Sequence, residues 1–444
     1  MARFKSGLDV DQGLLLPPSL REWLPEDHLA WFIMDAVDAL DIDVLLDSYR
    51  QCGKGELPYD PRMMLRVLIY AYSTGTFSSR KIASQLCDSV AFRVLAGNQT
   101  PGHRSICRFR KNHIEQFGLL FAQVVRTAAE TGMVKIGTLA IDGSKLKANA
   151  SKHKAMSYDR MKEEEKRLER EIAAILKLAQ DTDAEEDVEL GPDFRGDELP
   201  EELRRRETRL ERIREAKARL EKRKAEEALA AEEAKKAAAA KEGRRFTERP
   251  DQRKHPKGEP KPKDQENFTD PDSRIMKTSK GFEQCYNAQI AVDGDSRLIV
   301  GTVVDNCAAD VGQLLPVLEV ATENVGLPVN ELLADAGYRS EENFAALERA
   351  EIDAFVPLGR EGKSARDPGE GKEATARMQE KLNTDEGRAR YRRRKHIAEP
   401  PFGWLKHVLG FRSFSLRGLV NVAGEFCLVA LALNLRRMKG MATP

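Results

Sequence analysis

Three acidic residues have sequence surroundings that favour chemistry at a carboxylate. Asp142 follows the apolar residues of LAIDGSK, and Asp335 follows those of LLADAGY. Glu399 is the one acidic residue in 387–418, a segment with nine lysines and arginines. A basic segment that only gripped phosphate would bind it better without that carboxylate. Carboxylate oxygens suit Mg²⁺, and two divalent ions about 3.5–4 Å apart can drive phosphodiester cleavage.

Each of the three carboxylates also has a purely structural interpretation. An aspartate followed by glycine at a strand end is ordinary turn chemistry. Glu399 precedes Pro400 and Pro401, and a glutamate at a helix start there would interact favourably with the helix dipole. The occurrence of all three in one fold order argues for a shared site instead.

The elements around these residues predict how they are positioned. Apolar and polar residues alternate over 284–304 around an Asp293-Gly294 turn, which indicates a hairpin. Shorter strands lead to Asp142 and Asp335, and helical patterns separate the later strands. The order of strand, strand, strand, helix, strand, helix, strand predicts a mixed α/β sheet of the ribonuclease H type. We expect the two aspartates to lie at the same end of neighbouring strands.

The N-terminal part of the chain is predicted to be helical and to bind DNA. Residues 62–116 carry nine basic and two acidic side chains, whereas residues 1–61 carry five basic and twelve acidic ones. Short amphipathic helices in a basic block favour a helix-turn-helix-like DNA reader. The cations of PGHRSICRFRK are expected to contact the DNA backbone: Arg104, Arg108, Arg110 and Lys111.

A charged insertion follows the first predicted core strand. Residues 161–245 are rich in Glu, Lys, Arg, Ala and Leu, with heptad-like apolar spacing in two arms that Lys217 interrupts once. Two long helices in a coiled coil are therefore expected. Residues 181–202 hold eleven acidic side chains and one basic one, which predicts a solvated loop. A flexible linker rich in Pro, Lys and Arg is expected over 241–263.

Taken together, these motifs resemble the DDE transposases of bacterial insertion sequences, in the insertion-sequence four-and-five superfamily. IDGSK and DAGY stand at two of the family's strand motifs, and a C-terminal helix carries the third motif in Tyr391, Arg394, Glu399 and Lys406. Four residues separate Arg394 from Glu399, and Lys395 stands at the family's three-residue spacing, so either cation could take the arginine's place. PYDPRMMLRVLIYAYSTG and TDPDSRIMKTSKGFEQCYNAQIAVD also match.

The resemblance implies a catalytic core of the ribonuclease H-like (retroviral integrase) type. Asp142, Asp335 and Glu399 would be the catalytic residues and would bind two Mg²⁺ or Mn²⁺ ions. The protein would cleave the ends of its element and join the 3′ ends to target DNA. The partners would be double-stranded DNA and further copies of the chain, in a homodimer or larger synaptic complex. The terminal phosphates would be held by cations and an aromatic residue of the last motif: Tyr391, Arg394, Lys395 and Lys406.

We expect three regions in the chain. A helical N-terminal DNA-binding domain covers 1–130, and a ribonuclease H-like DDE domain combines 131–155 with 266–444. Between those two segments lies the charged helical coiled-coil insertion with its linker, over 156–265. Because the cysteines are scattered and no apolar run approaches the ~20 residues of a membrane span, a soluble cytosolic protein is expected. The resemblance further implies the cytoplasm of a bacterium, in association with the nucleoid.

Several further residues have weaker signals. Asp270, Asp272 and Arg274 could form an accessory site, although an Asp-Pro-Asp turn that caps a strand explains them equally. Asp310 is expected to cap a helix. A zinc site at His103, Cys107 and His113 is disfavoured for want of a second close ligand pair, and Trp404 is expected to pack or to stack on an unpaired base.

Two other functions stay open. A net charge of +1 gives no overall sign for a nucleic-acid binder, but this sum cancels strongly basic and acidic segments. A ribonuclease H-like nuclease that cuts without joining would carry the same carboxylates. A non-catalytic DNA-binding or coiled-coil assembly protein would need none of them.

Overall fold

A computed structural model describes most of the chain as two compact units. The first combines Met1–Leu146 with Asn287–Pro444, and the second is Lys147–Tyr286. The residues described are 19–190 without 48 and 50–57, 201–241, 256, 258–359 and 371–442. The N-terminal helices and the sheet that follows them belong to one unit, whereas the expected division separates them at residue 130. The three-region division therefore stays a prediction.

The first unit is built on a mixed sheet. Its strands are β1 (Thr138–Lys147), β5 (Gly281–Asp293), β6 (Ile299–Asp305), β7 (Glu331–Leu333) and β8 (Asp353–Phe355). They are ordered β6-β5-β1-β7-β8, with β6 antiparallel to β5 and with β7 parallel to both β1 and β8. The sheet thus combines antiparallel and parallel neighbours, and the mixed α/β sheet is confirmed.

Strand β1 differs from the sequence prediction at its end. It continues past Asp142 to Lys147, so Asp142-Gly143 is not a turn. The glycine is explained by packing, because a Cβ atom on Gly143 would clash with the side-chain amide of Gln289 on β5. The absence of a side chain at Gly143 instead lets this glutamine lie against the backbone of the residue that follows Asp142.

Helices pack around this sheet. Helices α10 (Leu314–Val325) and α14 (Leu419–Ala442) lie against β6, whereas helices near the other edge contact β8. The latter are α11 (Glu341–Arg349), α12 (Glu373–Asn383) and α13 (Asp385–Gly403). Ser340 caps α11 by accepting a hydrogen bond from the amide of Asn343, a role that suits serine at a helix N-terminus.

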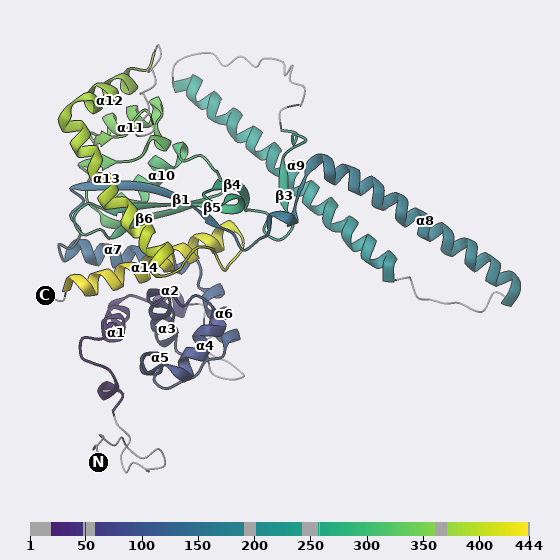
Figure 1. Cartoon of the computed structure of the whole chain (residues 1–444), viewed down its shortest axis with the longest axis horizontal. Helices are drawn as coiled ribbons and strands as arrows, with labels where there is room; N and C mark the ends of the chain where they lie inside the picture. Colours follow the sequence, from purple (N-terminus) through teal and green to yellow (C-terminus); the bar gives the residue numbers. More distant parts are fainter. Residues whose placement is uncertain are drawn as a thin grey trace, which may run out of the picture. The chain divides into compact units, whose positions relative to one another are not determined.

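The N-terminal part is helical, as expected, and α14 packs against it. The helices are α1 (Leu29–Ala39), α2 (Asp43–Leu46), α3 (Pro61–Ser73), α4 (Ser79–Asp88), α5 (Val90–Leu95), α6 (His103–Asn112) and α7 (Gln116–Glu130). Figure 1 shows α14 between the sheet and the helices α1 to α5, with α7 beside it, and α14 contacts α1, α3 and α7. This packing explains why both parts form one unit.

Helix α14 is long and apolar enough to cross a membrane by length and composition alone. However, 67% of its most apolar 18-residue stretch is buried inside the protein. Its apolar character is therefore accounted for by its contacts with β6, α3 and α7.

The second unit contains a long helical hairpin, visible in Figure 1 as the pair α8 and α9. Helix α8 spans Tyr158–Leu190 and α9 spans Glu201–Lys241. A short antiparallel pair, β2 (Ala155–Ser157) and β3 (Gln265–Asn267), joins the base of the hairpin, and β4 (Arg274–Thr278) pairs with the start of β5. The two long helices are confirmed.

An apolar seam joins α8 to α9. It buries side chains from both helices: Met161, Leu168, Leu210, Ile213 and Ala216. Lys217, which interrupts the heptad pattern, is half-buried and pairs with Glu165 at 2.8 Å. Helix α8 extends to Leu190, so the first half of the predicted acidic loop is helical. Residues 191–200, and 242–255 of the predicted linker, lie outside the described residues, and the coiled-coil interpretation stays a prediction.

Candidate active site

The strand register places Asp142 and Asp335 at equivalent positions. Strands β1 and β7 are parallel neighbours, and Ala140 is paired with Leu333. Asp142 comes two residues after Ala140, and Asp335 comes two residues after Leu333. The two aspartates therefore lie at equivalent register positions of adjacent parallel strands, as expected, although Asp142 lies within β1 and not at its end.

Helix α13 supplies Glu399 together with a buried cation. Arg394 is only 9% exposed, and its guanidinium lies 3.6 Å from Oδ1 of Asp142 and 3.7 Å from Oε1 of Glu399. One arginine thus connects carboxylates from β1 and α13. Since α13 runs from Asp385 through Pro400 and Pro401 to Gly403, Glu399 is not at a helix start, and the helix-dipole interpretation was wrong.

The electrostatics of Asp142 reflect this crowding. The pKa of Asp142 is raised to about 6, and burial is the largest cause. The negative charges of Asp335 and Glu399 also raise this pKa, whereas Arg394 and the amide of Gly143 lower it. All three carboxylates therefore interact electrostatically with one another or with Arg394. A cation among these carboxylates would oppose the rise in the pKa of Asp142.

Asp335 is held by the turn that follows β7. Its Oδ1 accepts a hydrogen bond of 2.7 Å from the amide of Gly337 and so caps the short helix Ala336–Tyr338. Tyr338 is fully buried and donates a hydrogen bond to the side-chain oxygen of Gln289. The short helix that Asp335 caps is therefore connected through Tyr338 to the side chain of Gln289 on β5.

The same network of polar side chains includes Asp310. Its Oδ1 accepts hydrogen bonds from Lys145 at 2.8 Å, Asn287 at 2.8 Å and Gln289 at 2.9 Å. Asp310 stands at the N-cap position of the short helix Val311–Gln313, as expected, but its side chain makes no capping hydrogen bond. Its real partners are polar side chains of β1 and β5, which need an acceptor because they are removed from water.

Sequence reasoning missed Asn287 and Gln289. Both are fully buried within β5, between apolar neighbours of the same strand. Two amide side chains inside an otherwise apolar strand were the available signal, because buried polar groups require partners. Their partners surround the two aspartates.

The predicted phosphate-holding residues of α13 differ in position. Arg394 lies at the site, whereas Lys395 is exposed, so the structure favours Arg394 for the arginine's role. Tyr391 is half-buried, with its ring 6.0 Å from the Arg394 guanidinium. Lys406 lies in the following π-helical turn, donates a hydrogen bond to Ser144 and has a pKa lowered by burial, although Asp142 opposes this shift.

The chemistry of the donor set fits a divalent metal ion. Three carboxylates provide the oxygen ligands that Mg²⁺ prefers. Among the residues that the structure describes, no three His, Cys, Asp or Glu side chains are arranged to share one ion. Instead, Arg394 contacts Asp142 and Glu399. Glu399 is 54% exposed at its side chain, so it is free of the packing that fixes Arg394.

The cations of α6 divide into two groups. Arg104, Arg108 and Lys111 are exposed, and their spacing puts them on one side of the helix. Arg110 is buried and donates hydrogen bonds to Tyr72 Oη at 2.8 Å and to the carbonyl of Phe77 at 3.0 Å. The expectation that Arg110 contacts DNA was therefore wrong, because its guanidinium binds neighbouring helices together.

The three residues considered for an accessory site lie in a hydrogen-bonded turn. Asp270 is fully buried and accepts a hydrogen bond of 2.8 Å from Tyr286, and Arg274 donates to the carbonyls of Pro271 and Ser273. Asp272 lies in the same turn before β4. This arrangement is the strand-capping turn that the sequence offered as the alternative to an accessory site.

The residues considered for a zinc site and for base stacking differ in exposure. His103 and Cys107 are exposed, whereas His113 is buried against Tyr49 and Phe109. Trp404 is 40% exposed and lies 5.2 Å from the Arg436 guanidinium.

Comparisons with protein families cover both ends of the chain. A family model described as Transposase domain (DUF772) matches residues 18–112, and one described as Transposase DDE domain matches residues 257–435. The second match includes Asp335 and Glu399 but not Asp142, which lies before the insertion. Neither the curated proteins nor the solved structures that were compared give a match. The two transposase models, with a ribonuclease H-like order of strands, show that the chain belongs to the metal-dependent DDE transposases of insertion sequences.

Proposed function

We propose that this transposase cleaves the ends of its insertion sequence and joins the 3′ ends to target DNA, with Asp142, Asp335 and Glu399 as its catalytic carboxylates. The observation that carries the proposal is the position of Arg394 between Asp142 and Glu399. It unites the first and last carboxylates, while the β1–β7 register unites the first with the second.

The three carboxylates would hold two Mg²⁺ or Mn²⁺ ions, since their oxygens suit hard divalent cations. Such ions would lower the pKa of the attacking water or 3′-hydroxyl and would stabilise the attacking and leaving oxygens. Asp142 is positioned by β1 and Asp335 by its bond to Gly337. Glu399 is the most exposed of the three side chains and is able to adjust.

Cations next to the carboxylates would position the DNA ends. Lys406 contacts Ser144, two residues after Asp142, and Arg394 is held between two acids. Both would interact with the phosphate at the cleaved bond, because positive charge there stabilises the transition state. Tyr391 would pack beside Arg394, and Lys395, exposed on the same helix, would contact DNA outside the reacting centre.

The N-terminal helices would bind the element ends through the exposed cations of α6: Arg104, Arg108 and Lys111. Two DNA ends must meet for transposition, so we propose a homodimer or larger assembly on DNA. The protein would act in the bacterial cytoplasm at the nucleoid.

Strand transfer tests this function against simple cleavage. A pre-cut duplex with an element-end sequence and a free 3′-hydroxyl is incubated with supercoiled plasmid and Mg²⁺. We expect covalent joining of the labelled 3′ end to plasmid, with no joining when EDTA is added. Cleavage of uncut ends without any joining would instead identify a nuclease and overturn the proposal.

A further inference from the structure

The helical insertion carries a large cationic groove. It lies where α9 and the start of α8 meet the β2–β3 pair, and we call it the insertion groove. Its volume is about 1100 Å³, and seven lysine or arginine side chains line it against two glutamates. Its apolar floor includes Met156, Ile213 and Phe268, which also pack on the seam between the helices.

Outside the insertion groove, many charged side chains of α8 and α9 form ion pairs. Arg214 binds Glu165 at 3.0 Å and Glu169 at 2.5 Å, and Arg167 binds Glu164 at 2.6 Å. Four cations of the insertion groove are exposed and make no ion pair with any residue that the structure describes: Lys154, Arg160, Arg204 and Arg212. Cations therefore outnumber acidic side chains in this concave surface, and among the four only Arg160 has a longer-range interaction with a described glutamate, Glu164. A cleft lined by charges of one sign concentrates the electric field.

The spacing of two of these cations suits a nucleic-acid backbone. Arg204 and Arg212 are eight residues apart on α9, which corresponds to about 12 Å along a helix axis. That span is close to the ~12 Å width of the major groove of duplex DNA. Thr208, which also lines the insertion groove, stands midway between them and could donate a hydrogen bond to phosphate.

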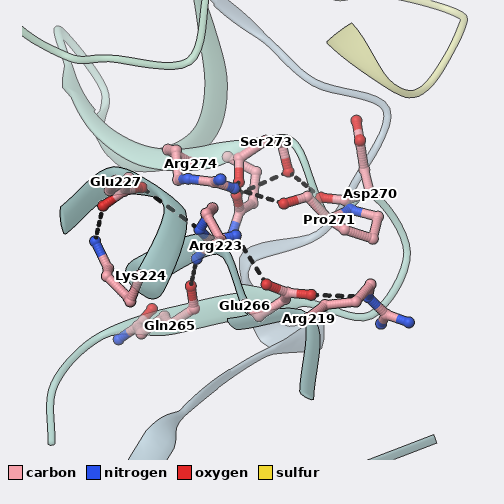
Figure 2. A network of polar contacts seen from close by, with 11 residues as sticks. Arg219, Arg223, Lys224, Glu227, Gln265, Glu266, Asp270, Pro271, Ser273 and Arg274 are labelled. Atoms are coloured by element: carbon pink, nitrogen blue, oxygen red, sulfur yellow. Dashed lines mark hydrogen bonds and ion pairs between the residues drawn. The ribbon is translucent and has the colours of Figure 1, made fainter. Parts of the chain in front are cut away.

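The base of the insertion groove is fixed by a buried carboxylate. Figure 2 shows Arg219 and Arg223 of α9 reaching Glu266 of β3, at 2.9 and 2.8 Å. Glu266 is 1% exposed, so these ion pairs attach α9 to a buried carboxylate of β3. Arg219 lines the insertion groove, and its bond to Glu266 keeps that wall in place before any ligand binds.

We propose that the insertion groove binds the phosphate backbone of duplex DNA, independently of sequence, and so forms a second DNA contact besides the N-terminal helices. This inference rests on the proposed transposase function for its biological purpose. Its chemistry does not depend on cleavage. Phosphate contacts position a protein on DNA, while base contacts specify the sequence, and the insertion groove offers mainly cations.

The test is equilibrium binding of the full chain to a 30-base-pair duplex without element ends, by fluorescence anisotropy in EDTA over a range of KCl concentrations. The variant is Arg204→Ala/Arg212→Ala. A matched control is Lys166→Ala/Arg170→Ala, which removes two exposed cations of α8 that lie outside the insertion groove and make no ion pair with a described residue. Both variants change the net charge equally.

We expect the Arg204/Arg212 variant to bind on the order of tenfold more weakly or worse at 0.1 M salt. Its log affinity should fall less steeply with log salt, by about 0.9 for each phosphate that the variant no longer neutralises. The control should keep the wild-type slope. Equal behaviour of the two variants, or an unchanged slope in the first, would overturn the proposal. So would a change in oligomeric state by sedimentation without a change in slope, which would assign the insertion groove to a second copy of the chain.

Two further measurements keep these outcomes interpretable. If circular dichroism shows a decrease in helix content for the alanine variant, Arg204→Lys/Arg212→Lys retains the charges and should retain the slope. A folded lysine variant whose log affinity depends less steeply on log salt than that of the wild type would contradict an electrostatic contact. Because metal is absent from the binding assay, a wild-type protein that binds through the insertion groove but never cleaves DNA would refute the transposase mechanism alone.

Discussion

The guanidinium of Arg394 lies 3.6 Å from the carboxylate of Asp142. A buried cation of α13 is thereby joined to a strand more than 240 residues earlier in the chain. The contact links the two elements that the insertion and the rest of the sheet separate in sequence. It also gives the like-charged carboxylates a compensating charge before metal binds.

Replacing Arg394 should therefore be more damaging than replacing its neighbour. Arg394→Ala removes the cation that contacts Asp142 and Glu399, and we expect Mg²⁺-dependent end cleavage to fall by about 10²-fold or more. Lys395→Ala removes an exposed cation and should weaken DNA binding with much less effect on the cleavage rate of bound DNA. Single-turnover cleavage at saturating protein measures both. A larger loss in the Lys395 variant would reverse the assignment.

Substitutions at different positions of α6 should affect either protein stability or DNA binding. Arg110 donates to Tyr72, and Tyr72 also contacts Glu425, which is fully buried on α14. Arg110→Ala leaves these groups without their cation and should lower the free energy of unfolding by about 3 kcal/mol or more.

The exposed neighbours Arg104 and Arg108 give the matched comparison. Arg104→Ala/Arg108→Ala should leave the free energy of unfolding within about 1 kcal/mol of wild type while weakening binding to an element-end duplex. Urea unfolding and anisotropy report the two properties separately. An Arg110→Ala protein of normal stability but reduced DNA affinity would show that Arg110 contacts DNA after all.

The helical hairpin should lose stability in acid. The hydrogen bond from Arg167 is the largest cause of a lowered pKa for Glu164, and that from Lys217 is the largest for Glu165. A carboxyl whose pKa is lower in the folded state stabilises the fold above its unfolded pKa of about 4.3. That contribution disappears as pH falls through the folded pKa.

We therefore expect the thermal midpoint of the helical circular dichroism signal to fall between about pH 5 and pH 3. Glu164→Gln/Glu165→Gln should make this fall shallower, because the neutral side chains have no proton to gain. Glu163→Gln, at an exposed position with no ion pair to a described residue, is the control and should follow wild type. An identical acid profile in all three proteins would contradict the role of these pairs.

The sequence predicted the strands and helices well because their local patterns agree with the fold. The Asp293-Gly294 turn joins β5 to β6, where Asp293 accepts from the amide and hydroxyl of Ser296. Gly326 ends α10 in the left-handed conformation, at φ 71°. These are local choices of backbone conformation, and the residue types that favour them are visible without tertiary contacts.

Features that depend on distant contacts could not be predicted in this way. Gly143 resembled a turn glycine, but its position depends on Gln289, 146 residues later. Arg110 resembled its exposed neighbours, but α14 supplies Glu425 near its partner Tyr72. Asp310 had the local context of a helix cap, whereas three side chains from β1 and β5 donate to its carboxylate. Contacts with distant residues decided each case, and such contacts are a property of the whole fold.

The central claim is that Asp142, Asp335 and Glu399 act together in metal-dependent cleavage. Its most direct test is the rate of Mg²⁺-dependent cleavage of a labelled element end by Asp142→Asn, Asp335→Asn and Glu399→Gln, with DNA affinity measured in parallel. We predict that each variant cleaves on the order of 10²–10³-fold more slowly or worse and binds the same duplex as tightly as wild type. Wild-type cleavage by any one of these variants would contradict the claim.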